Sequence, residues 1–439
     1  QVTYIQGYQN ETEELGEKQL QDTIEKLKQE YRKKDCVILY FIDLTESYEG
    51  EGYDRKNLKI PQNQEELLAE IAETVGKDHI AAISFGGAPM DFSFEKNVGA
   101  ILHMYLGGQA VGESVADLIS GEVNPSGKLA ETIPFSEKDT PAWRYFAPPN
   151  DDVEYRESIF VGYRYYETFH VPVKYPFGYG LSYTSFSYSE LNVPEVYSGG
   201  KIQIRFKIKN IGKVSGAEIA QLYICPIESD VIRSHIELKE FQKIYLHPGE
   251  EKEVILELDE RSFSVYDVEK KAFSMLSGKY QICIGASVHD LQLKANMEVV
   301  GNSYFRNERE LFPDYFREQP HGMEISAEQF YQLLGGEPKH DKEKKRGEYT
   351  VYDSYQDVVN VSMFGKFVRG VVHIGLKIIL RGKSERDPAF KMVKMGVEEG
   401  NLEGLIATSG GIATPKLIDM LVYNANKKYL QAFKRLLKK

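Results

Sequence analysis

The sequence predicts a multidomain α/β plus all-β protein: a partial α/β sandwich with a mostly parallel sheet, a β-sandwich and a C-terminal helical extension. Three observations support this fold class. Apolar runs alternate with helical patterns and short glycine-containing loops over residues 36–120. Short segments with period-two alternation follow over residues 185–300, and helical periodicity dominates residues 351–439. These three patterns are typical of an α/β domain, an antiparallel sandwich and a group of helices, respectively.

The first part of the chain alternates strands and helices. We expect a short strand at 2–7, a helix at 13–33, a strand at 36–44, a helix at 62–75, strands at 79–85 and 99–105, and a helix at 109–119. Pro61 precedes the second helix, where proline commonly marks a start. Glycine pairs follow the 79–85 strand and precede the last helix, as expected of tight connections. This order favours a mostly parallel sheet that helices cover.

The middle of the chain changes character. Residues 121–190 are rich in Pro, Gly, Tyr and Asp, and loops this long are usually functional or join domains. Alternating strands with regular turns then indicate a sandwich of immunoglobulin type. The expected organisation is a partial α/β sandwich at 1–140, an aromatic-rich interdomain segment at 141–184, a β-sandwich at 185–300, a linker with short helices at 301–350 and a helical extension at 351–439.

The C-terminal region is charged and helical. A polar linker, KHDKEKKRG, occupies residues 339–347. The tail NKKYLQAFKRLLKK, residues 426–439, is basic and amphipathic. One interpretation is a solvated terminal helix, and the alternative is a helix that binds a membrane surface or a partner protein.

Composition excludes several classes of protein. A net charge of -12 argues against a general nucleic-acid binder. The three cysteines lie in separate apolar runs without CxxC or Cys/His metal spacing, so we expect a reducing compartment and no disulfide framework. We also expect neither a metal site nor a cofactor. Residues 364–380 are apolar but too short and too charged to span a membrane. Gln1 is not an initiator Met, so we expect an internal fragment or a processed chain.

The stretch Tyr48–Arg55, YEGEGYDR, carries the clearest chemical signal. Two carboxylates and two glycines follow a predicted buried strand, and ligands bind at the carboxyl ends of strands in α/β proteins. Glycine lets the backbone turn sharply beside a substrate, and a carboxylate there can transfer a proton. The alternative is an acidic surface loop. His79, His103 and His170 have neither an acidic partner in sequence nor metal spacing, so we interpret them as structural.

Five further segments carry a recognisable pattern, at residues 46–68, 105–135, 155–167, 175–189 and 238–250. In this order they together resemble glycoside hydrolase family 3 of the β-glucosidase type. The resemblance implies three domains in such enzymes, a TIM barrel, an α/β sandwich and a fibronectin type III-like domain, of which residues 1–300 match the last two. It therefore implies that this chain is the C-terminal part of the enzyme, without the barrel. Residues 301–439 are similar to a helical extension of some bacterial members.

The resemblance also implies a chemistry. Retaining glycosidases use two carboxyl groups, a nucleophile and an acid/base. In this family the barrel supplies an Asp nucleophile, and the acid/base is the Glu before Gly-Tyr/Phe-Asp-Arg, which is Glu51 here. Glu49 is the nearest rival, and its alternative role is a solvated carboxylate or a partner of Arg55. Asp54 and Arg55 are expected to fix the loop, and Tyr53 to pack beneath it or border the substrate.

The resulting hypothesis is the C-terminal portion of a retaining exo-acting β-glycosidase that hydrolyses terminal non-reducing β-linked sugars. Expected partners are an oligosaccharide or β-glycoside substrate and the missing barrel domain; the sequence also permits a homo-oligomer. The fragment alone is expected to be inactive, and the location cytoplasmic. The competing hypothesis is a non-catalytic carbohydrate-binding or scaffolding protein. A nucleotide-binding protein is a weaker third, because the sequence has no GxGxxG or GxxxxGK[ST] motif.

Overall fold

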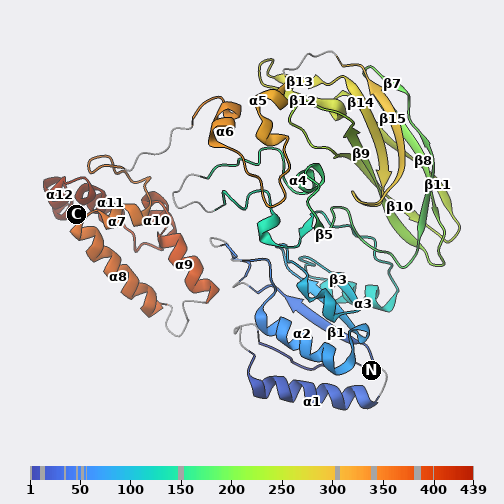
Figure 1. Ribbon diagram of the computed structural model, residues 1–439. Helices are drawn as coiled ribbons and strands as arrows, with labels where there is room; N and C mark the ends of the chain where they lie inside the picture. Colours follow the sequence, from blue (N-terminus) through green and yellow to red (C-terminus); the bar gives the residue numbers. More distant parts are fainter. Residues whose placement is uncertain are drawn as a thin grey trace.

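The computed structural model describes residues 2–9, 15–33, 36–45, 48–50, 54–55, 57–146, 153–301, 307–337, 344–379, 387–398 and 400–438. Figure 1 shows an α/β part at the N-terminal end, a β-sandwich above it and a group of C-terminal helices to one side. The predicted combination of a parallel sheet, a β-sandwich and C-terminal helices is therefore confirmed.

The α/β part contains a three-stranded parallel sheet in the order β1-β2-β3. Its elements are α1 (Glu17–Lys33), β1 (Ile38–Asp43), α2 (Gln62–Val75), the 3-10 turns η1 (Lys77–His79) and η2 (Ser93–Asn97), β2 (Ile80–Phe85), β3 (Ala100–His103) and α3 (Val111–Ser120). Burial alternates along β1 because only one face of the sheet packs into the core formed with α2. Leu39 and Phe41 lie on the opposite face and are exposed.

The strand expected at residues 2–7 is wrong, because the described residues 2–9 form no strand. A strand needs a neighbour to which its backbone can hydrogen-bond. Here β1 pairs with β2, and the N-terminal segment instead packs against the helices. Ile5 and Tyr8 contact the core, Gly7 lies against Leu67 of α2, and the hydroxyl of Tyr8 donates to the carbonyl of Phe41.

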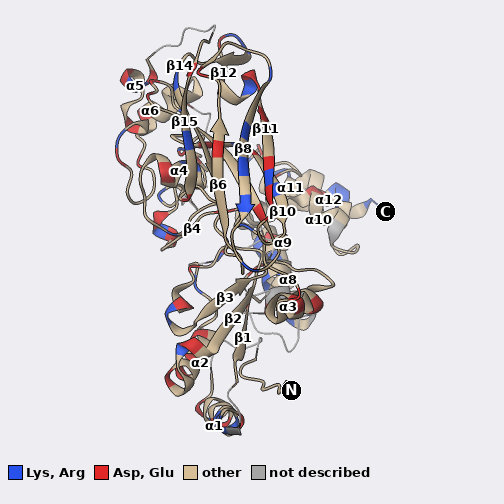
Figure 2. Cartoon of the chain, turned by 90° about the vertical axis from the view of Figure 1, so that its right-hand side faces the viewer, with Lys and Arg blue, Asp and Glu red and all other residues tan. Residues whose placement is uncertain are grey.

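The β-sandwich consists of two antiparallel-dominated sheets, β10-β9-β14-β15-β7 and β11-β8-β6. Its strands are β6 (Phe186–Asn192), β7 (Val196–Tyr197), β8 (Ile202–Asn210), β9 (Gly216–Pro226), β10 (Glu237–Leu246), β11 (Glu251–Leu258), β14 (Gly278–Gly285) and β15 (Leu291–Val299), with η4 (Glu260–Phe263) and the hairpin β12 (Ser264–Asp267) and β13 (Ala272–Met275) at one end. Inward residues alternate with charged outward ones, and Figure 2 shows Lys and Arg on β8 beside Glu on β11. This alternation is what the period-two pattern predicted.

Aromatic side chains fill the junction between the α/β part and the sandwich. The short elements here are β4 (Ile133–Pro134), η3 (Glu137–Asp139), α4 (Tyr163–Thr168), β5 (Val173–Tyr175), α5 (Glu308–Leu311), η5 (Pro313–Tyr315) and α6 (Ala327–Leu334). Phe160, Tyr165, Phe312 and Tyr315 are buried in one cluster, so residues before and after the sandwich pack together. The hydroxyl of Tyr165 donates to the carbonyl of Gln319 at 2.7 Å, which satisfies a buried polar group.

The C-terminal helices form a unit with a core of its own, which we call the helical unit (residues 344–438, as far as described). Its helices are α7 (Tyr355–Asn360), α8 (Met363–Ile379), α9 (Pro388–Glu398), α10 (Leu402–Thr408), α11 (Pro415–Ala425) and α12 (Tyr429–Leu437). Val358, Leu402 and Leu421 are buried at its centre. The described part of the chain contains no helix long and apolar enough to cross a membrane.

One buried amide joins the turns at an end of the sandwich. Asn210, the last residue of β8, is fully buried. Its Oδ1 accepts from Thr184 Oγ1 at 2.7 Å and from the backbone N–H of Gly212 at 3.0 Å. Its Nδ2 donates to the carbonyls of Val214 and Leu246 at 2.9 and 3.1 Å. All four hydrogen-bonding positions of the amide are therefore occupied.

Replacing this amide should destabilise the sandwich. Asn210→Ala leaves buried donors and acceptors without partners, so we expect a loss of about 2–4 kcal/mol in the free energy of unfolding. Urea denaturation of both proteins measures it. Asn192→Ala, at an exposed position of β6, is the matched control and should change stability by less than about 0.5 kcal/mol. Equal effects of the two substitutions would contradict a structural role for the buried amide.

Candidate active site

The three parallel strands end at one edge of the sheet, and their following loops are hydrogen-bonded to one another. Beyond β1, the N–H of Leu44 donates to the carbonyl of Phe85 at 3.3 Å. Beyond β2, the N–H of Gly86 donates to the carbonyl of Tyr105 at 3.2 Å. The backbone pairing therefore continues past the strands, which brings the loops after β1, β2 and β3 together at the edge where α/β proteins bind ligands.

The carboxylate of Glu49 binds two backbone N–H groups of the loop after β2. Oε2 accepts from Gly87 at 2.9 Å and Oε1 accepts from Ala88 at 2.6 Å. A short turn positions this side chain, because the N–H groups of Tyr48 and Glu49 both donate to the carbonyl of Thr45. Hydrogen bonds to an ionised carboxylate contribute about 1.5–3 kcal/mol each, so the contact fixes the loop firmly.

Glycine at position 86 makes this contact sterically feasible. Gly86 has φ +159°, and a Cβ there would lie 2.8 Å from Leu44 Cδ1 and 3.1 Å from Glu49 Oε1. Any larger residue would push against the two groups that bring the loops after β1 and β2 together. The glycine pair after the second strand thus lets this backbone approach the carboxylate closely.

Arg55 fixes the other end of the same loop. Its Nη1 donates to the carbonyl of Pro89 at 2.6 Å, and Nη2 donates to the carbonyl of Lys59 at 2.9 Å. Burial lowers the pKa of the guanidinium, and the nearby charge of Glu49 opposes that shift. Glu49 and Arg55 therefore both bind the segment from Gly87 to Pro89.

The sequence-predicted site residues are thus distributed in three ways. Glu49 and Arg55 are brought together on one backbone segment, and Glu49 is bound by backbone N–H groups rather than extending into solvent. Asp54 is exposed. Glu51 and Tyr53 lie outside the described residues, between the two fixed ends of the loop. Among the described residues, no group of three or more His, Cys, Asp or Glu could hold a metal ion.

Further titratable groups line the same edge of the sheet. Burial, followed by the charge of Glu49, raises the pKa of Asp43 at the end of β1. Burial raises the pKa of Glu131, while its interaction with the Tyr105 hydroxyl acts in the opposite direction. Tyr105 follows β3, so its position at the end of a predicted strand could have identified it from the sequence as a residue of this edge. Glu131 comes from a loop distant in sequence, and no local pattern marks it.

His103, at the end of β3, is neutral and packed. Its Nδ1 lies 2.9 Å from Ser84 Oγ, and its ring centroid is 4.1 Å from that of Tyr105 and 5.2 Å from that of Phe92. Burial lowers its pKa to about 4. These contacts are those of a structural histidine, as the sequence suggested.

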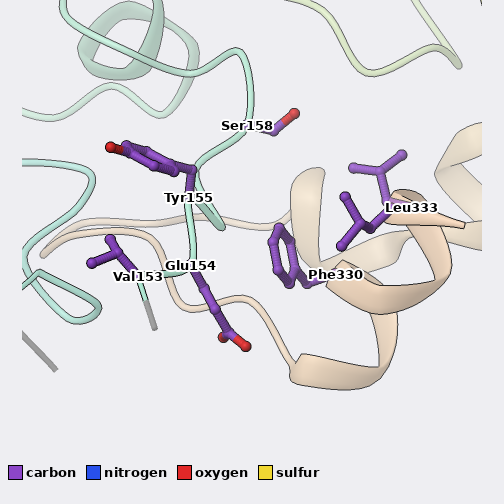
Figure 3. A pocket seen from close by; sticks show the side chains of 7 residues that line it. Val153, Glu154, Tyr155, Ser158, Phe330 and Leu333 are labelled. Atoms are coloured by element: carbon purple, nitrogen blue, oxygen red, sulfur yellow. The ribbon is translucent and has the colours of Figure 1, made fainter. Parts of the chain in front are cut away.

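A separate pocket lies between residues 153–158 and α6. Its volume is about 470 Å³, and Tyr155, Phe330 and Leu333 line it, as Figure 3 shows. Glu154 also borders the pocket, but Arg156 donates to its carboxylate at 2.6 Å and Tyr331 donates to it at 2.7 Å. None of its lining residues belongs to the loops at the sheet edge. We therefore take the sheet edge, not this pocket, as the candidate active site.

The neutral state of His103 predicts how stability depends on pH. An unfolded histidine has a pKa of about 6.5 and binds a proton that folded His103 excludes down to pH about 4. Stability should therefore rise with pH across this window and fall on acidification. Between pH 4.5 and pH 7, roughly the two ends of this window, the free energy of unfolding should change by about 1–2 kcal/mol less in His103→Asn than in the parent chain. Urea denaturation of both proteins at the two pH values measures the difference.

The exposed His373 of α8 provides a control for this experiment. His373→Asn should leave the pH dependence of stability as it is in the parent chain. An unchanged slope in His103→Asn would mean that the buried imidazole is not the group that resists protonation.

Two known domain families match successive parts of this chain. The profile of the glycosyl hydrolase family 3 C-terminal domain matches residues 1–183, and that of a fibronectin type III-like domain matches residues 218–288. Thermostable beta-glucosidase B of Acetivibrio thermocellus is 40% identical over 300 residues, which are 68% of this chain and 39% of that protein. An exo-alpha-(1->6)-L-arabinopyranosidase of Bifidobacterium breve is 36% identical, covering 62% of this chain and 36% of the relative.

Solved structures show the same relationship. The GH3 beta-glucosidase of Bifidobacterium adolescentis superposes with a TM-score of 0.62 at 34% identity, covering 67% of this chain and 43% of that one. Beta-glucosidase 3B of Thermotoga neapolitana, in complex with alpha-D-glucose, gives 0.58 at 33%, covering 64% and 40%. The chain spans less than two-fifths of the length of the curated relatives it matches. It therefore belongs to glycoside hydrolase family 3 and carries that family's C-terminal domain followed by a fibronectin type III-like domain.

Proposed function

We propose that this chain supplies the acid/base half of the active site of a retaining, exo-acting β-glycosidase. Glu51 is the general acid/base, and a barrel domain of the same enzyme carries the Asp nucleophile. The match to the family's C-terminal domain and the names of the relatives support the reaction class. The substrate is a terminal, non-reducing β-linked sugar.

The observation that carries the proposal is the fixation of the loop on both sides of Glu51. Glu49 binds the N–H groups of Gly87 and Ala88, and Arg55 binds the carbonyl of Pro89. A general acid must lie within hydrogen-bonding reach of the glycosidic oxygen, and small displacements are costly in rate. The two fixed residues, Glu49 and Arg55, are six positions apart in the sequence, and Glu51 comes between them.

The chemistry follows the double-displacement route. The nucleophile attacks the anomeric carbon while Glu51 donates its proton to the departing oxygen, which breaks the glycosidic bond and leaves a glycosyl-enzyme. Glu51, now a carboxylate, takes a proton from water, and that water releases the sugar. Glu51 must therefore start protonated.

The names of the relatives guide the choice of substrates to test. Some carry the name beta-glucosidase and others exo-alpha-(1->6)-L-arabinopyranosidase, at similar identity. An aryl β-glucoside, an aryl β-xyloside and an aryl α-L-arabinopyranoside are therefore the first substrates to compare. The rate ratio among them, measured as kcat/KM, assigns the sugar.

Substitution of the acid/base should give a defined kinetic signature. In a protein that includes the barrel, Glu51→Ala should lower kcat on an aryl β-glucoside by about 10²–10⁴-fold. Azide should restore turnover and give a glycosyl azide of retained configuration, because an anionic nucleophile needs no base. Glu298→Ala, at an exposed position of β15, should be fully active.

The same assay contains the outcomes that would reject the proposal. Full activity of Glu51→Ala would remove that residue from the mechanism. Turnover by the 439-residue chain alone that depends on Glu51 would show that no barrel nucleophile is needed. No activity in the barrel-bearing protein on any of the three substrates would favour the scaffolding alternative.

Glu49 should behave as a positioning residue, distinct from the acid/base. Glu49→Gln keeps one acceptor but turns an amide NH₂ toward the second N–H, so the loop loses a fixed point. We expect kcat to fall by about 10–100-fold with a smaller change in KM, and hydrogen exchange at the amides of Gly87 and Ala88 to accelerate.

Azide rescue distinguishes the role of Glu49 from that of Glu51. It should fail to rescue Glu49→Gln, because that variant still holds Glu51, and the alkaline limb of the pH–rate profile, along which Glu51 loses its proton, should remain. Rescue of Glu49→Gln by azide, or loss of that limb, would mean that Glu49 itself transfers the proton.

A further inference from the structure

The outer face of α8 exposes a continuous apolar stripe. Val368, on the inner face of this helix, is buried in the core of the helical unit. The side chains of the stripe are spaced by three or four residues along α8 and are 54–89% exposed: Met363, Phe367, Val371, Ile374 and Ile378. This spacing puts all five on one line along a helix about 25 Å long. Single exposed apolar residues are ordinary, but an aligned row of five is typical of an interaction surface.

The α8 helix is also basic. It carries Lys366, Arg369 and Lys377 and contains no Asp or Glu. Helical spacing places the two lysines on the side of the helix next to the apolar stripe, away from the core. Their long apolar stems can lie along the stripe while the ammonium groups extend beyond it.

The terminal helix α12 repeats this combination. It also contains no Asp or Glu. Leu430, Phe433 and Leu437 are 59–79% exposed, while Ala432 on the opposite side is buried. Lys434 and Arg435 lie within the helix, and further lysines flank it on both sides. Both α8 and α12 pack against α11, so one small unit presents two basic helices with exposed apolar residues.

Positive charge is concentrated on this unit. Residues 344–439 contain 18 Lys and Arg and nine Asp and Glu, a net charge of +9. Residues 1–343 contain 36 and 57, a net charge of -21. Figure 1 shows the helical unit set apart from the sandwich, and Figure 2 shows blue Lys and Arg positions on α12 near the C-terminus.

We propose that the stripe of α8, assisted by α12, binds the surface of an anionic lipid membrane with the helices parallel to the surface. Large apolar side chains bordered by Lys and Arg fit the boundary between acyl chains and anionic headgroups. The helices are too short and charged to cross the membrane, and none in the described chain has that capacity.

Two competing occupants are less suited to this surface. A second copy packed stripe to stripe would bring Lys366 and Lys377 against like charges, which opposes association. An acidic protein surface would complement the charge, but large exposed side chains such as Met363 and Phe367 would then need a matching apolar groove as well. A lipid surface supplies negative charge and apolar volume together.

Vesicle flotation tests the proposal directly. The 439-residue chain is mixed with vesicles of phosphatidylcholine containing about one third phosphatidylglycerol, and with vesicles of phosphatidylcholine alone. We expect binding to the anionic vesicles only, weakened about tenfold or more by added salt. The double substitution Phe367→Ser and Ile374→Ser should weaken binding by about tenfold or more, because both side chains lose their apolar contact with lipid.

Matched controls separate the stripe from general hydrophobicity. Phe241→Ser with Ile255→Ser removes two exposed apolar side chains from the sandwich and should leave binding unchanged. Lys366→Gln with Lys377→Gln should reduce binding to anionic vesicles while leaving the helix intact, as circular dichroism can check.

Several outcomes would overturn the proposal. Failure of the chain to bind anionic vesicles, or equal binding by the α8 variant, would do so. A dimer in sedimentation velocity that the α8 variant abolishes, without vesicle binding, would identify the stripe as an interface between copies. Binding by this chain but not by a protein that includes the barrel would identify it as an intramolecular contact.

Discussion

The bidentate contact between Glu49 and the N–H groups of Gly87 and Ala88 is the interaction on which the candidate site depends. It joins the loops that follow two neighbouring parallel strands, and both loops leave the sheet at the same edge. A carboxylate has two oxygens that can each accept a hydrogen bond, and here they meet two consecutive backbone donors. The geometry of the loop thereby follows the geometry of the sheet.

Burial decides how costly the loss of this contact would be. Arg55 is partly buried, and its pKa is lowered by that burial while the charge of Glu49 acts the other way. Neutralising Glu49, as in Glu49→Gln, would therefore leave a partly desolvated guanidinium with less compensation, in addition to one N–H group without its acceptor. The two ends of the loop are consequently coupled through charge as well as through the backbone they share.

The sequence could predict the elements and the loop but not the contacts that fix it. The helix expected at 62–75 is α2 residue for residue, because proline before it and strong helix formers within it agree. The partners of Glu49 are 38 and 39 positions away in sequence and are backbone groups, so no side-chain pattern could identify them. Period-two alternation in VTYIQG likewise could not reveal that the segment has no strand beside it.

Several of the 29 tyrosines of this chain are packing residues. Tyr165, Tyr223 and Tyr315 are fully buried near the junction with the sandwich. A tyrosine fills a large volume and still satisfies its hydroxyl, as Tyr315 does with the carbonyl of Arg156 at 3.0 Å. Such residues suit a junction where apolar surfaces of two domains meet and loop carbonyls remain to be bonded. These buried tyrosines at the junction therefore belong to the packed structure itself.

The separation of charge between the helical unit and the rest of the chain bears on how the stripe of α8 can stay exposed. An apolar row of this length would ordinarily promote self-association. The net charge of +9 on residues 344–439 opposes the approach of a second helical unit, because each contact between stripes would also bring together cationic side chains. The same charge attracts an anionic surface. The charge and the apolar surface of this unit thus act together: they disfavour a second helical unit and favour an anionic surface. Neither feature would do both alone.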